Sequence, residues 1–244
     1  MKKIMASALL SCMLLSTTAM NANEAGDWEH KVSIYGWLPT LDGTLTFQVP
    51  GDPDESADSN AIDSLDSVFM VSYEARKNKW LFLTDLIYLK MSGDTEGLNP
   101  NVNLNLELTA KLYSFYGGYN LSDTNNMSID VIAGIRYFSL GLDITRTGGN
   151  ILNGTLSSEV ENYDAVIGLK GKYNINANWY IPYQFDIGAG DSDLTWQANA
   201  SLGYHFDWGD VIATYRYMHY DKGDSLLLED FDLYGPKLGV VFHF

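Results

Sequence analysis

Residues 238–244 read LGVVFHF, and they close the chain with apolar side chains where a terminus usually carries small polar ones. Side chains of a β-strand point alternately to its two faces. One face of this stretch is therefore made by Leu238, Val240, Phe242 and Phe244. The alternation predicts a terminal strand that presses an apolar face, up to the last residue, against apolar surroundings.

The same period of two returns along most of the chain. Apolar side chains recur at most of the alternate positions in the segments 106–116, 163–173, 179–187 and 196–206, with polar or charged residues between many of them. The pattern predicts ten strands, at approximately 30–48, 67–76, 80–91, 103–121, 127–143, 159–174, 179–188, 193–206, 210–221 and 231–244.

Alternation alone also fits a soluble sandwich or a lipocalin-like barrel, whose apolar face lies inside. Two details favour a transmembrane barrel. The polar faces carry charges of both signs, and aromatic residues stand near both ends of the apolar faces, as in Tyr163 with Tyr173. Eight residues span about 26 Å of strand, or about 20 Å at a tilt of about 40°, close to the apolar band of an outer-membrane barrel.

We therefore predict an all-β fold, a transmembrane antiparallel up-and-down β-barrel of ten strands. Eight or twelve strands are open alternatives, because the segment GWLPTLDGTLTF at 36–47 suits either one bulged strand or a small extra hairpin. Short connections at 77–79, 122–126, 174–178 and 207–210 alternate with longer ones at 50–66, 92–102, 145–158 and 222–230. This alternation predicts short periplasmic turns and long extracellular loops.

The N-terminus has the form of a secretory signal peptide, residues 1–22. Lys2 and Lys3 precede an apolar run that is too short to span a membrane, and cleavage is expected after Ala19 or Ala22. Residues 23–244 would then form one barrel domain. The only cysteine, Cys12, falls within the signal, which excludes a disulfide scaffold and thiol catalysis in the mature chain. A formal net charge of −16 argues against nucleic-acid binding.

The charged residues of the polar strand faces are predicted to line the lumen. Buried charges without partners are costly, so these residues would form a network that fills the barrel or lines a narrow aqueous path. The residues are Lys31, Glu74, Arg76, Asp85, Glu107, Lys111, Asp130, Arg136, Asp164, Lys170, Lys172, Asp186, Arg216 and Lys237.

An inward Asp85 makes one sector of the lumen apolar, because the same parity turns Leu81, Leu83, Ile87 and Leu89 inward. We interpret these four side chains as packing, with a hydrophobic ligand path as the alternative.

The segment 50–66 contains six acidic residues and no basic one. It predicts a solvated acidic loop, with a cation-attracting rim as the alternative. Its spacing does not match a calcium-binding EF-hand loop, and we predict neither a metal site nor a cofactor. His219 and Asp221 share a strand face near an outer rim, but no serine or further carboxylate cluster is placed beside them. We therefore predict no catalytic residues and no enzyme activity.

The chain resembles the small outer-membrane β-barrels of Gram-negative bacteria, of the outer-membrane-protein-A-like and W-like kind, over nearly the whole mature sequence. The segments SIYGWLP at 33–39 and YEARKNKWLFLTDLIYL at 73–89 are similar to a widespread set of such barrels. The resemblance implies that Leu238, Val240, Phe242 and Phe244 form the signal read by the barrel-assembly machinery. It also implies a place in the cell outer membrane, with periplasmic chaperones, outer-membrane lipid and lipopolysaccharide as partners.

On this basis we expect a small passive, porin-like channel or a structural envelope protein with acidic extracellular loops. One alternative is a W-like barrel that binds or admits a small hydrophobic molecule. The other is an outer-membrane enzyme with its site at the rim.

Overall fold

The computed structural model describes residues 28–45, 65–96, 102–148, 154–221 and 228–244. The signal peptide and most of the acidic segment 50–66 lie outside these residues. The strands are β1 (Glu29–Trp37), β2 (Thr40–Leu45), β3 (Leu65–Lys77), β4 (Trp80–Glu96), β5 (Val102–Asp123), β6 (Met127–Gly148), β7 (Gly154–Asn174), β8 (Trp179–Gly190), β9 (Leu194–Phe206), β10 (Gly209–Asp221) and β11 (Leu228–His243).

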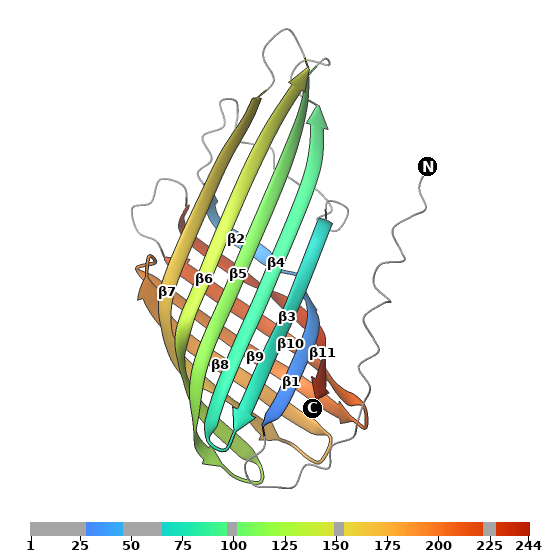
Figure 1. Ribbon diagram of the computed structural model, residues 1–244, viewed down its shortest axis with the longest axis vertical. Helices are drawn as coiled ribbons and strands as arrows, with labels where there is room; N and C mark the ends of the chain where they lie inside the picture. The colour runs from blue at the N-terminus through green and yellow to red at the C-terminus, as the bar shows by residue number, and fades with distance from the viewer. Residues whose placement is uncertain (1–27, 46–64, 97–101, 149–153, 222–227) are drawn as a thin grey trace.

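The strands form one antiparallel sheet that closes on itself, because β1 pairs with both β3 and β11 (Figure 1). β2 also pairs with β11, directly beyond β1, so β1 and β2 together form one interrupted strand of a ten-strand barrel. The predicted barrel is confirmed, and residues 36–45 belong to one interrupted strand rather than to an extra hairpin, because the register against β11 is the same before and after the interruption. At the interruption the chain comes close to β11, where a Cβ on Gly235 would lie 2.2 Å from the carbonyl oxygen of Leu38.

The barrel is much taller on one side. β5 and β6 have 22 residues each, whereas β8 has 12, and β4 to β7 rise well above the rest in Figure 1. Twenty-two residues extend about 73 Å, or about 55 Å along the axis at a tilt of about 40°, against a hydrocarbon core of about 30 Å. The long strands therefore continue beyond any membrane that the barrel spans.

The outer wall is an apolar belt between two aromatic rows. In the upper row, the ring of Tyr137 lies 5.7 Å from that of Tyr113 and 4.8 Å from that of Tyr163. In the lower row, the Trp80 and Tyr119 rings are 5.2 Å apart. Tyr163 and Tyr173 lie at opposite ends of one outward face, about 33 Å apart along the strand and about 25 Å along the membrane normal.

This exterior is that of an outer-membrane barrel. Ile135, Ile167 and Leu238 of the belt are each more than half exposed, which is costly in water and favourable in lipid. Within the described residues, no helix is long and apolar enough to cross a membrane. The terminal strand is placed as its alternation predicted, with Leu238 and Phe244 exposed on the outer wall and Val241 buried inside.

Candidate functional site: the filled lumen

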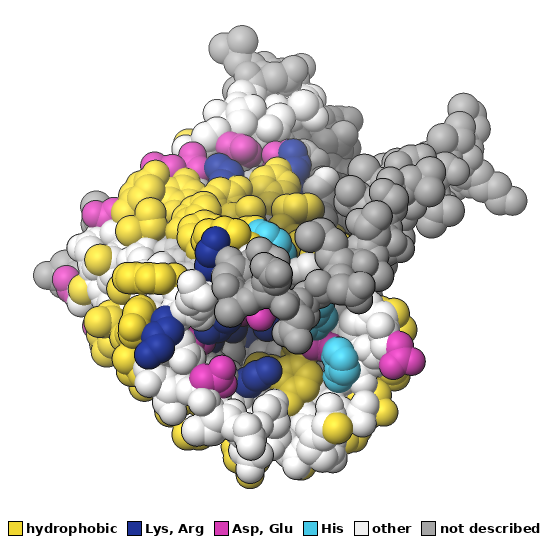
Figure 2. All heavy atoms as spheres, turned by 60° about the horizontal axis from the view of Figure 1, so that its bottom comes forward, with side chains coloured by type: hydrophobic (Ala, Val, Ile, Leu, Met, Phe, Trp, Pro, Cys, Tyr) yellow, Lys and Arg dark blue, Asp and Glu magenta, His cyan; other side chains and the backbone are white. Residues whose placement is uncertain are grey.

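The lower end of the barrel, where the short turns lie, opens into a cavity of about 500 Å³. Charged and histidine side chains gather around this hollow in Figure 2, whereas hydrophobic ones cover the outer wall. Glu74 lies among three cations, with its carboxylate 3.2 Å from Lys170 and 3.6 Å from both Lys31 and Arg76. Arg76 also holds Asp130 through two hydrogen bonds, of 2.9 and 2.7 Å. The mouth of the barrel at this end is thus lined by paired charges.

A group of buried ion pairs, here called the ion-pair belt, crosses the lumen above this cavity. Arg136 donates to Asp186, and both side chains are fully buried. Arg216 donates to Asp85 at 2.9 Å and to Gln197 at 2.9 Å, and Gln197 donates to Asp186 at 2.7 Å. Gln197 therefore links the two ion pairs into one network.

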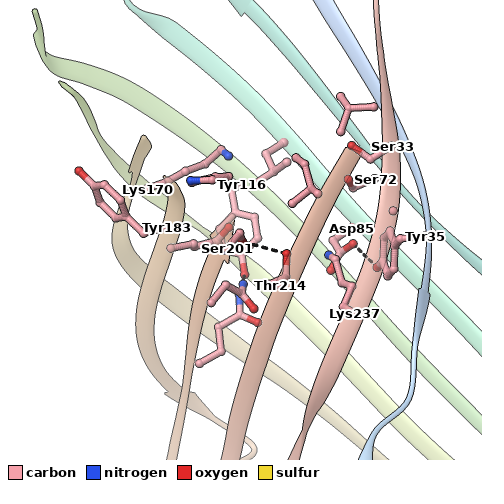
Figure 3. Close-up of a pocket in the computed structure, with 18 residues that line it drawn as sticks. Ser33, Tyr35, Ser72, Asp85, Tyr116, Lys170, Tyr183, Ser201, Thr214 and Lys237 are labelled. Atoms are coloured by element: carbon pink, nitrogen blue, oxygen red, sulfur yellow. Dashed lines mark hydrogen bonds between the residues drawn. The ribbon is translucent and has the colours of Figure 1, made fainter. Parts of the chain in front are cut away.

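A smaller cavity of about 140 Å³ touches the lower side of this belt. Figure 3 shows Tyr35, Asp85 and Lys237 together on one side of it. Tyr35 donates to Asp85 at 2.5 Å, and the Lys237 ammonium lies 3.7 Å from the centre of the Tyr35 ring. On the opposite side Thr214 donates to Ser201 at 2.8 Å.

An apolar cluster, here called the plug, fills the lumen above the belt. Its three central rings belong to Phe138, Tyr220 and Phe231, whose centroids lie 4.8–5.2 Å apart. Met218 and Tyr220 have no exposed surface. The plug consists of Tyr35, Trp37, Met70, Ile87, Leu112, Phe138, Met218, Tyr220 and Phe231, with Leu89, Leu140 and Leu233 packed against it.

The apolar side chains of β4 serve packing rather than a path. Ile87 and Leu89 belong to the plug, and Leu81 and Leu83 join a second buried cluster with Tyr116. Among these four β4 residues only Leu83 borders either cavity. They do not line a connected hydrophobic passage within the described part of the chain.

The structure places Glu107 and Lys111 on the outer face of the barrel, which corrects their prediction as lumen residues. Leu112 and Tyr116 of β5 are buried inside, so the opposite parity points outward. Lys111 pairs with Glu159 at 3.2 Å, and Glu107 pairs with Lys90 at 2.6 Å. Both ion pairs lie above the upper aromatic row, where β5 stands in water, so a charged outer face costs little there.

The other predicted lumen charges lie inside. Lys31, Glu74, Arg76, Asp130, Lys170 and Lys172 border the lower cavity, Asp85 and Lys237 border the smaller one, and Asp164, Asp186, Arg136 and Arg216 are buried. Asp164 accepts hydrogen bonds of 2.9 Å from the backbone and the hydroxyl of Ser192, in the turn between β8 and β9.

The charge pattern of the sequence does not reveal the neutral members of the network. Tyr116 bonds both Arg136 and Asp186, and Gln197 joins the two ion pairs. Gln197 lies on the polar face of its strand, and this parity could have identified it, whereas Tyr116 shares the apolar face of its strand with Leu112 and gives no such signal.

His219 of the rim-enzyme alternative points outward. Its Nδ1 lies 2.8 Å from the carboxylate of Asp232, and its ring lies 6.0 Å from that of Trp196.

No family model matches the sequence, and no curated protein is similar to it. Three solved outer-membrane proteins are similar to it in structure. Ail, the attachment invasion locus protein of Yersinia pestis, is 13% identical, covering 91% of this chain and 100% of its own, with a TM-score of 0.40. The translocator domain of the autotransporter NalP from Neisseria meningitidis is 12% identical, covering 92% of this chain and 90% of its own, with a TM-score of 0.43.

The outer-membrane protease OmpT from Escherichia coli is 10% identical, with 90% of this chain and 94% of its own covered and a TM-score of 0.45.

Proposed function

We propose that this protein is a structural barrel of the Gram-negative outer membrane that is closed at rest and has no enzyme activity. The observation that carries the proposal is the seal across the lumen, made by the buried ion-pair belt and the plug above it. The Arg136–Asp186 pair is fully buried, and so is Met218 in the plug. Close-packed side chains leave no room for a hydrated ion.

The buried network also connects distant strands of the barrel wall. Arg136, Asp186, Gln197, Arg216 and Asp85 come from five different strands, β6, β8, β9, β10 and β4. Their hydrogen bonds tie opposite walls together, as expected of a barrel whose role is to remain rigid and sealed. The acidic segment 50–66 would add negative charge to the extracellular end.

Single-channel recording in planar bilayers tests this proposal. Folded wild-type barrels should give no current steps above the membrane leak. The double variant Phe138→Ala/Tyr220→Ala removes two rings of the plug and should give measurable steps, whereas Leu169→Ala, on the outer wall, should stay silent. Steady conductance of the wild-type barrel would refute a closed resting state, and a silent plug variant would refute the role of the plug.

A second candidate, a channel that opens when the plug moves, is favoured by the two cavities. They lead from the periplasmic mouth to the ion-pair belt, with volumes of about 500 and 140 Å³. Such a channel would be silent at low voltage and would open reversibly as the voltage rises. Silence over the whole range that the bilayer tolerates would exclude it.

A further inference from the structure

Two of the four histidines of the chain meet an aspartate at the periplasmic mouth. His205 Nδ1 lies 2.6 Å from Asp210 Oδ1, and His243 Nε2 lies 3.0 Å from Asp210 Oδ2. The potential ligand atoms of the three residues all lie within 4.8 Å of one another. They border the lower cavity, in which histidine and acidic side chains are visible in Figure 2.

The backbone register sets this arrangement. His205 and Asp210 are direct partners across the tight turn between β9 and β10. Asp210 pairs with Val241 of β11, so His243 is the next inward residue on that strand. Side chains at direct and diagonal positions of neighbouring strands lie within reach of each other. The three groups are therefore held together by strand pairing before any ligand arrives.

Two imidazoles and one carboxylate are a ligand set for Zn²⁺ and its first-row neighbours. The two histidine side chains are 55% and 38% exposed, and that of Asp210 is 6% exposed. An ion could thus enter from the periplasm, and its remaining coordination positions would face the cavity. We propose that His205, Asp210 and His243 bind a divalent transition-metal ion such as Zn²⁺ at the periplasmic mouth of the barrel.

Tyr180 supports the site from β8. Its hydroxyl donates to Asp210 Oδ2, the oxygen that faces His243. The ring reaches Asp210 across Gly203, where a Cβ would lie only 2.5 Å from Tyr180 Cζ. Tyr180 is a positioning residue, because it orients the carboxylate that the ion would share.

The consequence of binding would be mechanical. His243 is the penultimate residue and lies opposite Lys31 of β1, at the seam where the barrel closes. An ion bound to it and to both strands of the β9–β10 hairpin would fasten the last strand to its neighbours. Because it binds the folded barrel alone, it would raise the stability of the barrel.

Zn²⁺ titration of the refolded mature protein, made without a histidine tag, tests the site. One Zn²⁺ should bind per barrel. His205→Ala and His243→Ala should each weaken binding by more than about 100-fold, and Tyr180→Phe by about 10- to 100-fold. The matched controls are His30→Ala and His219→Ala, which remove the two outward histidines and should bind as the wild type does.

Electrophoretic mobility before and after heating shows that each variant is folded, and His205→Gln and His243→Gln replace any alanine variant that is not. A Co²⁺ titration adds a visible absorption spectrum that requires protein ligands. The proposal is refuted if the wild-type barrel binds no Zn²⁺, or if folded variants at 205 and 243 keep the wild-type affinity.

Discussion

The buried pair of Arg136 and Asp186 makes a quantitative test of the lumen network. Arg136→Met removes the cation, but Asp186 keeps three neutral donors, Tyr116 at 3.2 Å, Gln184 at 3.1 Å and Gln197 at 2.7 Å. Asp186→Leu instead leaves the guanidinium with Tyr116 and Thr195, and its Nε has no hydrogen-bond partner within the described residues.

Breaking a buried pair costs about 3–5 kcal/mol. We therefore expect Arg136→Met to lose about 3 kcal/mol and Asp186→Leu about 5 kcal/mol of unfolding free energy. Asp186→Leu costs more because the guanidinium it leaves behind keeps fewer hydrogen-bond partners than the carboxylate that Arg136→Met leaves behind. The double variant, Arg136→Met with Asp186→Leu, should be no less stable than Asp186→Leu alone, because it removes both charges and leaves no unpaired charge in the lumen.

Reversible urea unfolding in lipid vesicles, followed by tryptophan fluorescence, measures all four proteins. An Asp186→Asn variant keeps the size of the side chain and isolates the loss of charge. Additive losses in the double variant would refute the coupling, and a larger loss for Arg136→Met than for Asp186→Leu would refute the ranking.

Three further predictions concern the wall. Ile135→Lys places a cation in the middle of the apolar belt and should cost about 2–4 kcal/mol of unfolding free energy in vesicles, whereas Lys111→Ala should change it little, because Lys111 lies above the upper aromatic row. Gly134→Ala should impair folding on the mobility gel, because its Cβ would lie 1.9 Å from the carbonyl oxygen of Phe115. Phe244→Asp should lower the amount of barrel in the outer membrane more than the amount synthesised, and equal membrane levels would contradict an assembly role for the last residue.

The sequence did not predict correctly which face of every strand points into the barrel. In β7, β9 and β11 the apolar parity faces lipid, but in β5 the apolar Leu112 and Tyr116 face inward while Lys111 faces outward. Both faces of β5 are largely apolar at the level of the apolar outer belt, and its charged residues lie beyond the membrane. The sequence alone cannot tell which apolar face meets lipid when the opposite one packs into a plug.

The sequence by itself determined the class of fold and the apolar terminal strand, and it favoured ten strands while eight or twelve stayed open. These follow from a period of two and from turn composition, which are properties of neighbours along the chain. Only the tertiary structure decided what fills the barrel. The seal unites Asp85, Arg136 and Arg216, and the histidine cluster unites His205, Asp210 and His243, because register and closure bring together inward side chains from strands far apart in sequence.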